Sequence, residues 1–109
     1  MNQDKYISIF IRDGYVCQRC GKNQSESRLT LAHRIRKGSG SEKWVYNFVL
    51  EKYGKELKTG FIREEILNHP DNLVVACAGA HNDSYNIFFK SVERDELLIE
   101  IIKKLNIIE

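Results

Sequence analysis

The sequence predicts a small α+β domain in which two short strands share a core with several helices. Two apolar runs of strand character, residues 28–35 and 72–77, stand far apart in the chain. Between and after them, apolar residues recur at spacings of three and four, the period of a helix that buries one face. Groups of metal-binding side chains flank both strands, and a bound structural metal ion commonly stabilises a domain with a modest core.

A chain of 109 residues, 42% hydrophobic and 29% charged, fits one globular domain spanning residues 1–109. It holds no apolar run of about 18 residues and no basic leader before an apolar stretch. We therefore expect neither a membrane span nor secretion. Three cysteines are an odd count for a disulfide framework, whereas reduced, metal-binding thiols suit a cytoplasmic protein. Oligomeric state is left open.

The first third of the chain alternates short elements with turns. Residues 4–12 predict a helix, although their alternating isoleucines would also suit a strand, and Asp13-Gly14 signals the turn that follows. Gly21 permits the tight backbone turn of a metal-binding knuckle. The strand predicted for residues 28–35 carries leucines on one side and Thr30 on the other.

Helical periodicity fills the stretch between the two strands. Ser41 can cap a helix that carries its apolar residues at helical spacing and ends at Gly54. A second short helix is predicted for residues 61–67, before the strand 72–77. Residues 41–67 therefore form a helical insertion between the strands.

Two further helices are predicted after the second strand. One runs from His81 to about Lys90. Ser91 then caps a C-terminal helix, residues 91–109, whose acidic residues lie in its first turns and whose lysines lie near its end, as the helix dipole favours. The apolar stripe of this helix consists of Leu98, Ile101, Ile102 and Leu105.

Two half-sites for a metal ion lie far apart in the sequence. Cys17 and Cys20 form a CxxC pair, whose thiolates can reach one ion from a single turn. Cys77 ends the second strand, and His81 follows it within reach of the first helical turn. Structural zinc takes four tetrahedral ligands, so the sequence predicts a zinc site made of these four side chains.

Basic residues gather near the N-terminus. Residues 1–37 hold eight Lys or Arg against three Asp or Glu (+5), and residues 38–109 hold nine against twelve (−3). No acidic residue lies between Glu26 and Glu42. The basic residues concerned are Arg28, Arg34, Arg36 and Lys37. Such a run would attract a phosphate backbone, with DNA as the partner, although an ordinary solvated face is the alternative. The net charge of +2 argues against purely electrostatic DNA binding.

With these pieces in this order, the chain resembles the HNH endonuclease family, which is built on the ββα-metal motif. The resemblance runs from Arg12 to about Ile87 and is interrupted by the helical segment 41–67. The matching pieces are Arg12–Lys22, Leu29–Ile35 and His69–Asp83. It implies a ββα-metal core with a two-stranded antiparallel hairpin, a zinc knuckle, a helical insertion and a C-terminal helix. It also implies a metal-dependent DNA endonuclease or nickase.

The resemblance gives roles to individual residues. A His at the end of the first strand acts in the family as the general base that activates water, and His33 matches that position. Its ordinary pKa of about 6.5 suits proton abstraction near neutral pH. An Asn at the start of the second strand braces the loop that holds this His, and Asn72 matches it. A third position, on the helix, binds Mg²⁺ or Mn²⁺, which stabilises charge on the phosphate and the leaving oxygen.

The helix position can be aligned with the family in two ways. In the commonest pattern, CxxCH, position 80 would be Cys, but it is Ala80. His81 would then be catalytic, and zinc would keep three protein ligands. In a pattern shifted by one residue, His81 completes the zinc site and Asn82 is the third catalytic residue. We prefer the second alignment because it completes the tetrahedron.

A second departure from the family concerns Ala32. The residue before the base is often Asp or His and helps to hold the catalytic cation. Asp83 or His69 could compensate, as could substrate phosphates and water, since Mg²⁺ readily keeps several waters. The alternative function is a zinc-stabilised DNA-binding module with a degenerate HNH site. A protein–protein adaptor that uses the C-terminal helix is a third interpretation, but it leaves His33 and Asn72 unused.

Overall fold

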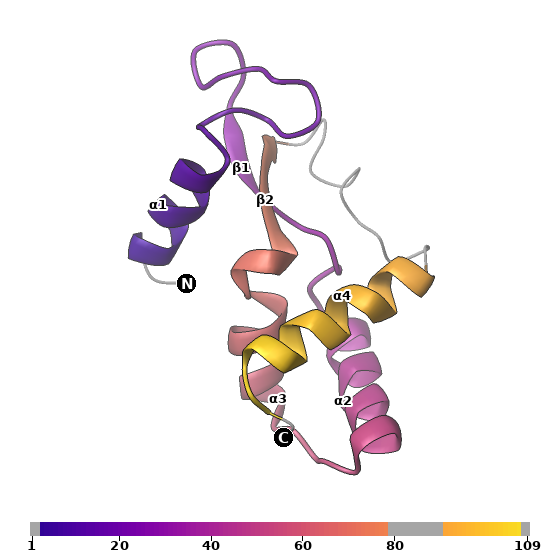
Figure 1. Ribbon diagram of the computed structural model, residues 1–109. Coiled ribbons are helices and arrows are strands. Elements are labelled where there is room, and N and C mark those ends of the chain that lie inside the picture. Colours follow the sequence, from indigo (N-terminus) through magenta and orange to yellow (C-terminus); the bar gives the residue numbers. More distant parts are fainter. Residues whose placement is uncertain (1–2, 79–90, 108–109) are drawn as a thin grey trace.

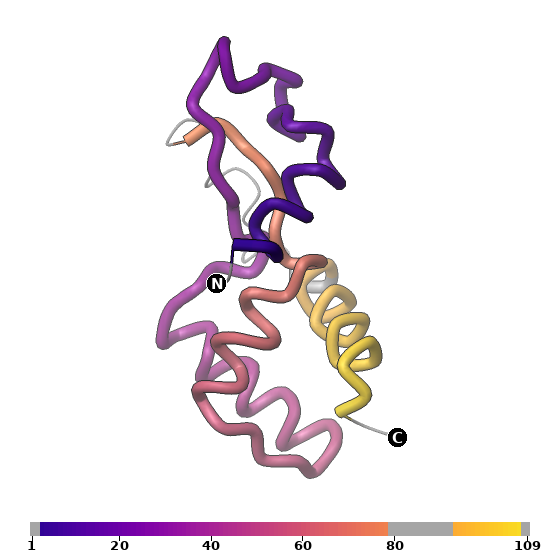
Figure 2. Tube along the Cα trace, turned by 90° about the vertical axis from the view of Figure 1, so that its left-hand side faces the viewer, coloured from indigo at the N-terminus to yellow at the C-terminus, as the bar shows by residue number. Residues whose placement is uncertain are grey.

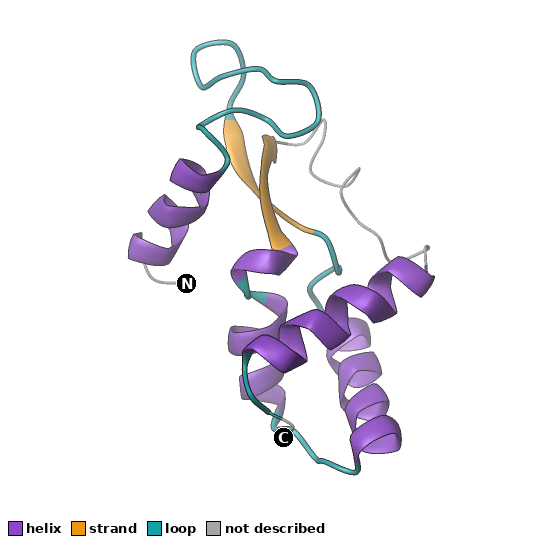
Figure 3. Ribbon diagram, viewed as in Figure 1, coloured by secondary structure: helices purple, strands orange, loops and turns teal. Residues whose placement is uncertain are grey.

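The computed structural model describes residues 3–78 and 91–107 of the chain, and its fold is α+β (Figure 1). The elements are α1 (Gln3–Arg12), β1 (Leu29–His33), α2 (Ser39–Tyr53), α3 (Thr59–Phe61), η1 (Ile62–Leu67), η2 (Pro70–Asn72), β2 (Leu73–Cys77) and α4 (Ser91–Lys104). Here η1 is a π-helix that continues α3, and η2 is a single 3₁₀ turn. In the described part of the chain, α1 lies beside one short hairpin, and the remaining helices lie beyond the end of the hairpin that is away from the knuckle loop (Figure 3).

The two strands pair antiparallel, as the sequence predicts. Leu29 lies opposite Cys77, and His33 lies opposite Leu73. Because side chains alternate along a strand, His33 and Cys77 project from the same face at opposite ends of the hairpin. The predicted helical insertion leaves the hairpin after β1 and returns to it before β2.

The second strand begins one residue later than predicted. Asn72 belongs to the turn η2, where its backbone N–H donates to the His69 carbonyl at 2.8 Å. Pro70 opens this turn, because its fixed φ suits the first helical position. The side chain of Asn72 consequently leaves the pleat of the strand and turns into the protein interior, where it is fully buried.

The start of α2 also differs from the prediction. The helix begins at Ser39, after Gly38 with φ of 137°, and no side chain caps it. Ser41 is buried inside the first turn and is therefore not the capping residue. The predicted end is confirmed: Gly54 has φ of 69° and donates its N–H to the Leu50 carbonyl, a left-handed cap that glycine adopts readily.

The molecule is elongated, 47 × 29 × 20 Å, and the described residues form two separate cores. Figure 2 shows the hairpin with the N-terminal segment in one half and the helices of the insertion with α4 in the other. The hairpin core consists of Ile9, Phe10, Cys17, Leu29, Ala32, Leu73, Val75, Ala76 and Cys77. The helical core consists of Ile35, Val45, Val49, Ile62, Ile66, Leu67, Leu97, Leu98, Ile101, Ile102 and Ile107.

The predicted apolar stripe of α4 faces the helical core. Leu98, Ile101 and Ile102 are fully buried there, and Leu105 packs against them. A face already covered by its own protein offers no docking surface, so the adaptor interpretation loses the feature on which it depends. None of the helices that the structure describes is both long and apolar enough to cross a membrane.

Candidate functional site

The segment between α1 and β1 folds into a knuckle around Cys17. The Cys17 N–H donates to the Lys22 carbonyl at 2.9 Å, and the Gly21 N–H donates to the Cys17 carbonyl at 2.8 Å. Gly21 has φ of 78°, a conformation that a side chain would strain. The Gln18 N–H donates to the Val75 carbonyl at 2.9 Å, which attaches the knuckle to β2.

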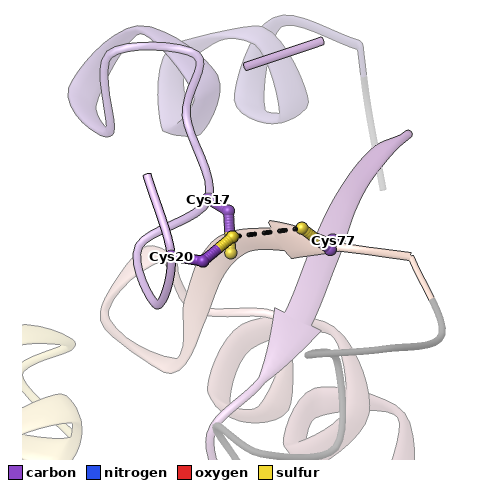
Figure 4. A group of neighbouring side chains, drawn as sticks. All are labelled: Cys17, Cys20 and Cys77. Atoms are coloured by element: carbon purple, nitrogen blue, oxygen red, sulfur yellow. Dashed lines mark hydrogen bonds between the residues drawn. The ribbon is translucent and has the colours of Figure 1, made fainter. Parts of the chain in front are cut away.

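This attachment brings the three cysteines together (Figure 4). The Sγ atoms of Cys17, Cys20 and Cys77 all lie within 4.8 Å of one another, and those of Cys20 and Cys77 are 3.5 Å apart. Zinc–sulfur bonds of about 2.3 Å in a tetrahedron hold sulfurs about 3.8 Å apart, so the three thiols fit one such ion. Cys17 and Cys77 are buried, whereas Cys20 is exposed.

The electrostatics of the cluster also favour a cation. A backbone hydrogen bond from Lys22 lowers the pKa of Cys20, but partial desolvation of its thiol and the neighbouring thiols of Cys77 and Cys17 together raise that pKa above its ordinary value. Thiolates so close to one another repel, and a shared metal ion removes that repulsion. The predicted fourth ligand His81 and the predicted catalytic Asn82 lie outside the described residues.

At the other end of the hairpin, half-buried His33 lines a hollow of about 580 Å³. Its Nε2 lies 2.9 Å from Oδ1 of Asn68. Burial lowers the pKa of His33 below its ordinary value; the hydrogen bond to Asn68 opposes this effect, and the charge of Lys37 adds to it. The other lining residues are Lys37, Gly38, Glu42, Arg63, Glu64, Leu67 and Asn68. A neutral imidazole that faces an open hollow is able to accept a proton near neutral pH.

Asn72 contacts Leu67, which lines this hollow, and is hydrogen-bonded through both the oxygen and the nitrogen of its amide. Its Oδ1 accepts the Ile35 N–H at 2.6 Å, while its Nδ2 donates to the carbonyls of Ile35 at 3.1 Å and Leu67 at 2.8 Å. The Asn72 carbonyl accepts the Arg34 N–H at 2.8 Å. The chain after His33 is thus held by a fully satisfied buried amide, which is a rigid arrangement.

The four predicted DNA-contacting residues divide into two groups. Arg28, Arg36 and Lys37 are exposed, and Lys37 lines the hollow beside His33. Arg34 is half-buried and faces α4, where it lines a second hollow with Glu93, Glu96 and Glu100, among other residues. Its guanidinium also donates to the Asp71 carbonyl at 3.4 Å.

Ala32 and His69, whose positions were considered for the catalytic cation, both lie outside the lining of the His33 hollow. Ala32 is fully buried in the hairpin core and, by strand alternation, projects from the face opposite His33. His69 caps the turn η2, because its Nδ1 accepts the Asp71 N–H at 3.1 Å. Asp83, the other candidate, lies outside the described residues.

Sequence reasoning missed Asn68 and the ion pair between Arg63 and Glu42. Asn68 lies directly after η1, and its only sequence signal is its place between an apolar helical run and His69-Pro70. Arg63 and Glu42 form two hydrogen bonds of 3.2 Å across the hollow, from different helices. Their proximity depends on how the insertion folds back, which no local pattern reveals.

Comparison with known proteins gives no match: no family model, curated protein or solved structure matches this chain. The three-thiol cluster and the His33 hollow are the features of the described residues that bear on function.

Proposed function

We propose that this chain is a metal-dependent DNA endonuclease or nickase with a ββα-metal core of the HNH type. One observation carries the proposal: a hairpin has three clustered thiols at one end and, on the same face at the other end, a half-buried His with a lowered pKa in an open hollow. The first group suits a structural metal, and the second suits acid–base chemistry.

A structural zinc ion would be held by Cys17, Cys20, Cys77 and, in the alignment that we prefer, His81. It would neutralise the thiolates and join the knuckle to the end of β2. The spacing of the three sulfurs supports this part of the proposal.

In the proposed reaction, His33 accepts the proton of the attacking water. Its lowered pKa keeps the imidazole neutral at physiological pH, so that the base is ready to act. Lys37 lines the same hollow and would attract a phosphodiester, whereas Arg63 is already paired with Glu42 there. Asn72 braces the backbone that follows His33. A bound Mg²⁺ or Mn²⁺, for which Asn82 is the proposed ligand, would supply stabilisation of the charge that builds on the phosphate and leaving oxygen.

A second candidate is a zinc-stabilised DNA-binding module without catalysis. The observation that favours it is Ala32, which is buried away from the hollow and carries no ligand atom for a catalytic cation. Exposed Arg28, Arg36 and Lys37 would still contact a phosphate backbone.

The deciding experiment incubates supercoiled plasmid with the purified zinc-loaded chain and Mg²⁺ or Mn²⁺. The wild type should nick or linearise the plasmid, and His33→Ala should cleave roughly 10²–10⁴-fold more slowly while keeping its zinc. His69→Ala is the matched control, because His69 caps a turn outside the hollow, and it should keep cleavage. Retarded DNA without cleavage would support the binding module, and DNA that is neither retarded nor cut would contradict both candidates.

The pH dependence of cleavage gives an independent check on His33. Its pKa lies below its ordinary value of about 6.5, so the neutral base predominates above that pH and is lost as the pH falls through the lowered pKa. We expect the rate to rise with pH in the acidic range and to level off before neutrality. A rate governed by a group that titrates well above pH 7 would argue against His33 as the base.

A further inference from the structure

We infer that Asn68, which directly follows the helical insertion, is a positioning residue that fixes the tautomer of His33. The inference deepens the endonuclease proposal and rests on it, because the tautomer decides which ring nitrogen can take a proton from water. The carrying observation is the hydrogen bond of 2.9 Å between Nε2 of His33 and Oδ1 of Asn68.

The chemistry of the two groups determines the direction of this bond. An amide oxygen only accepts hydrogen bonds, so Nε2 of His33 must carry the proton that it donates to Asn68. In a neutral imidazole the other nitrogen then holds a free lone pair. Nδ1 of His33 is consequently the basic atom, and Nε2 is committed to the protein.

The side chain of Asn72 holds the backbone near both His33 and Asn68. Asn72 Nδ2 donates to the carbonyl of Leu67, the residue before Asn68, and Asn72 Oδ1 accepts the N–H of Ile35, two residues after His33. A single buried amide therefore fixes the chain beside each partner. Asn68 also follows directly on η1, a six-residue π-helix, and such helices are rare and often occur at functional sites.

The side chain of Asn68 is uncharged, and this matters as much as its position. The charged groups that line the hollow are Lys37, Glu42, Arg63 and Glu64, and Glu42 is paired with Arg63. A carboxylate at position 68 would accept the same hydrogen bond but would stabilise the protonated imidazole. The amide orients the ring and leaves it neutral, and a general base needs both properties.

The tautomer can be measured without any assay of cleavage. We would record ¹⁵N NMR shifts of the imidazole nitrogens in the full zinc-loaded chain, above the pKa of His33, and assign its signals by comparison with His33→Ala. The wild type should show a protonated Nε2 and an unprotonated Nδ1. Asn68→Ala should give a mixture of tautomers, Asn68→Asp should keep the proton on Nε2, and the exposed control Asn47→Ala should match the wild type.

Cleavage kinetics then test the catalytic meaning of the tautomer. Asn68→Ala should lower kcat by about 10-fold or more, short of the loss in His33→Ala, with little change in KM for DNA. Asn68→Asp should move the acidic limb of the pH–rate profile to higher pH, because the carboxylate raises the pKa of His33. A purely structural Asn68 would instead give similar losses in both variants and no displacement of the profile.

The possible failures are distinguishable. A wild-type spectrum with the proton on Nδ1, or one that Asn68→Ala leaves unchanged, would overturn the inference whatever the activity. The expected spectra in a chain that cuts no DNA with either cation would overturn the endonuclease proposal and leave the tautomer assignment standing.

Discussion

The hairpin core and the helical core differ in what fills them. All eleven buried residues of the helical core are Ile, Leu or Val, whereas four of the nine in the hairpin core are Ala or Cys. Burial of aliphatic side chains contributes roughly 1.5–3 kcal/mol each, and small side chains contribute far less. The helical core can therefore depend on burial alone. The hairpin core has less apolar surface to bury, and its three thiols suggest that a metal ion supplies the difference.

The candidate site lies where the two regions meet. His33 ends a strand of the hairpin, while Arg63 belongs to the insertion that builds the helical core and Asn68 directly follows that insertion. Asn72 joins the regions through its bonds to Ile35 and Leu67. The thiol cluster lies in the hairpin core and the hollow lies between the two cores, so each can be perturbed separately.

Disruption of the thiol cluster should have the largest effect. Structural zinc contributes roughly 10–16 kcal/mol in small zinc-dependent peptides, so Cys17→Ala should lose most of the bound zinc and unfold the hairpin core. The helical core should keep part of its protection, because no cysteine lies in it. Metal analysis and amide hydrogen exchange would measure both, with chelated wild type as the reference. Full zinc retention would contradict the site, and complete loss of protection everywhere would show that the cores fold as one unit.

Truncation of a side chain within the helical core should destabilise the protein by less and should leave its zinc content unchanged. Ile101 is fully buried, and its replacement by Ala should lower the free energy of unfolding by about 2–5 kcal/mol through lost burial and the cavity left behind. Zinc content should stay at the wild-type level, since the thiol cluster lies in the other core. Urea denaturation with metal analysis tests this, and the half-buried Leu105→Ala should cost less. Loss of zinc in Ile101→Ala would mean that the two cores are not separable.

Removal of the joint between the regions should weaken cleavage by more than the loss of stability alone explains. Asn72→Ala leaves the N–H and carbonyl of Ile35 and the carbonyl of Leu67 without these partners, at a cost of roughly 1–3 kcal/mol for each group that stays unpaired. The cleavage rate should fall by more than the loss of folded protein explains, because the backbone near His33 and Asn68 loses the hydrogen bonds of Asn72. Thermal unfolding and cleavage rates, compared with the exposed control Asn47→Ala, measure the two effects. Activity that changes only in proportion to the folded fraction would count against this role.

Local patterns in the sequence predict the elements and the thiol cluster. Period-two alternation identifies the first strand, a short apolar run identifies the second, and CxxC spacing identifies the knuckle, since each depends on residues a few positions apart. The predicted cap at Ser41 is wrong because α2 begins two residues earlier, at Ser39. The residue before it, Gly38, has no side chain that could cap the first turn. Helix ends depend on backbone geometry that several nearby polar residues could satisfy equally well.

The hollow could be predicted only in part. His33 is recognisable because it ends a strand within a motif, and Asn72 because it precedes one. Asn68 and the pair Arg63–Glu42 become neighbours of His33 only through the path of the insertion. That path is set by packing of the helical core, which is a tertiary property without a fixed sequence spacing.

The pairing of β1 with β2 has a consequence for the order of folding. The register joins Leu29 to Cys77 across the whole insertion, so the chain must close a long loop before the first ladder bond forms. Contacts so distant in sequence slow folding, whereas helices form from local contacts. If the helices of the insertion pack together first, they bring His33 and Leu73 to within one strand spacing. This shortens the loop that the strand pairing has to close. We therefore expect the insertion to act as a template on which the two strands find their register late in folding.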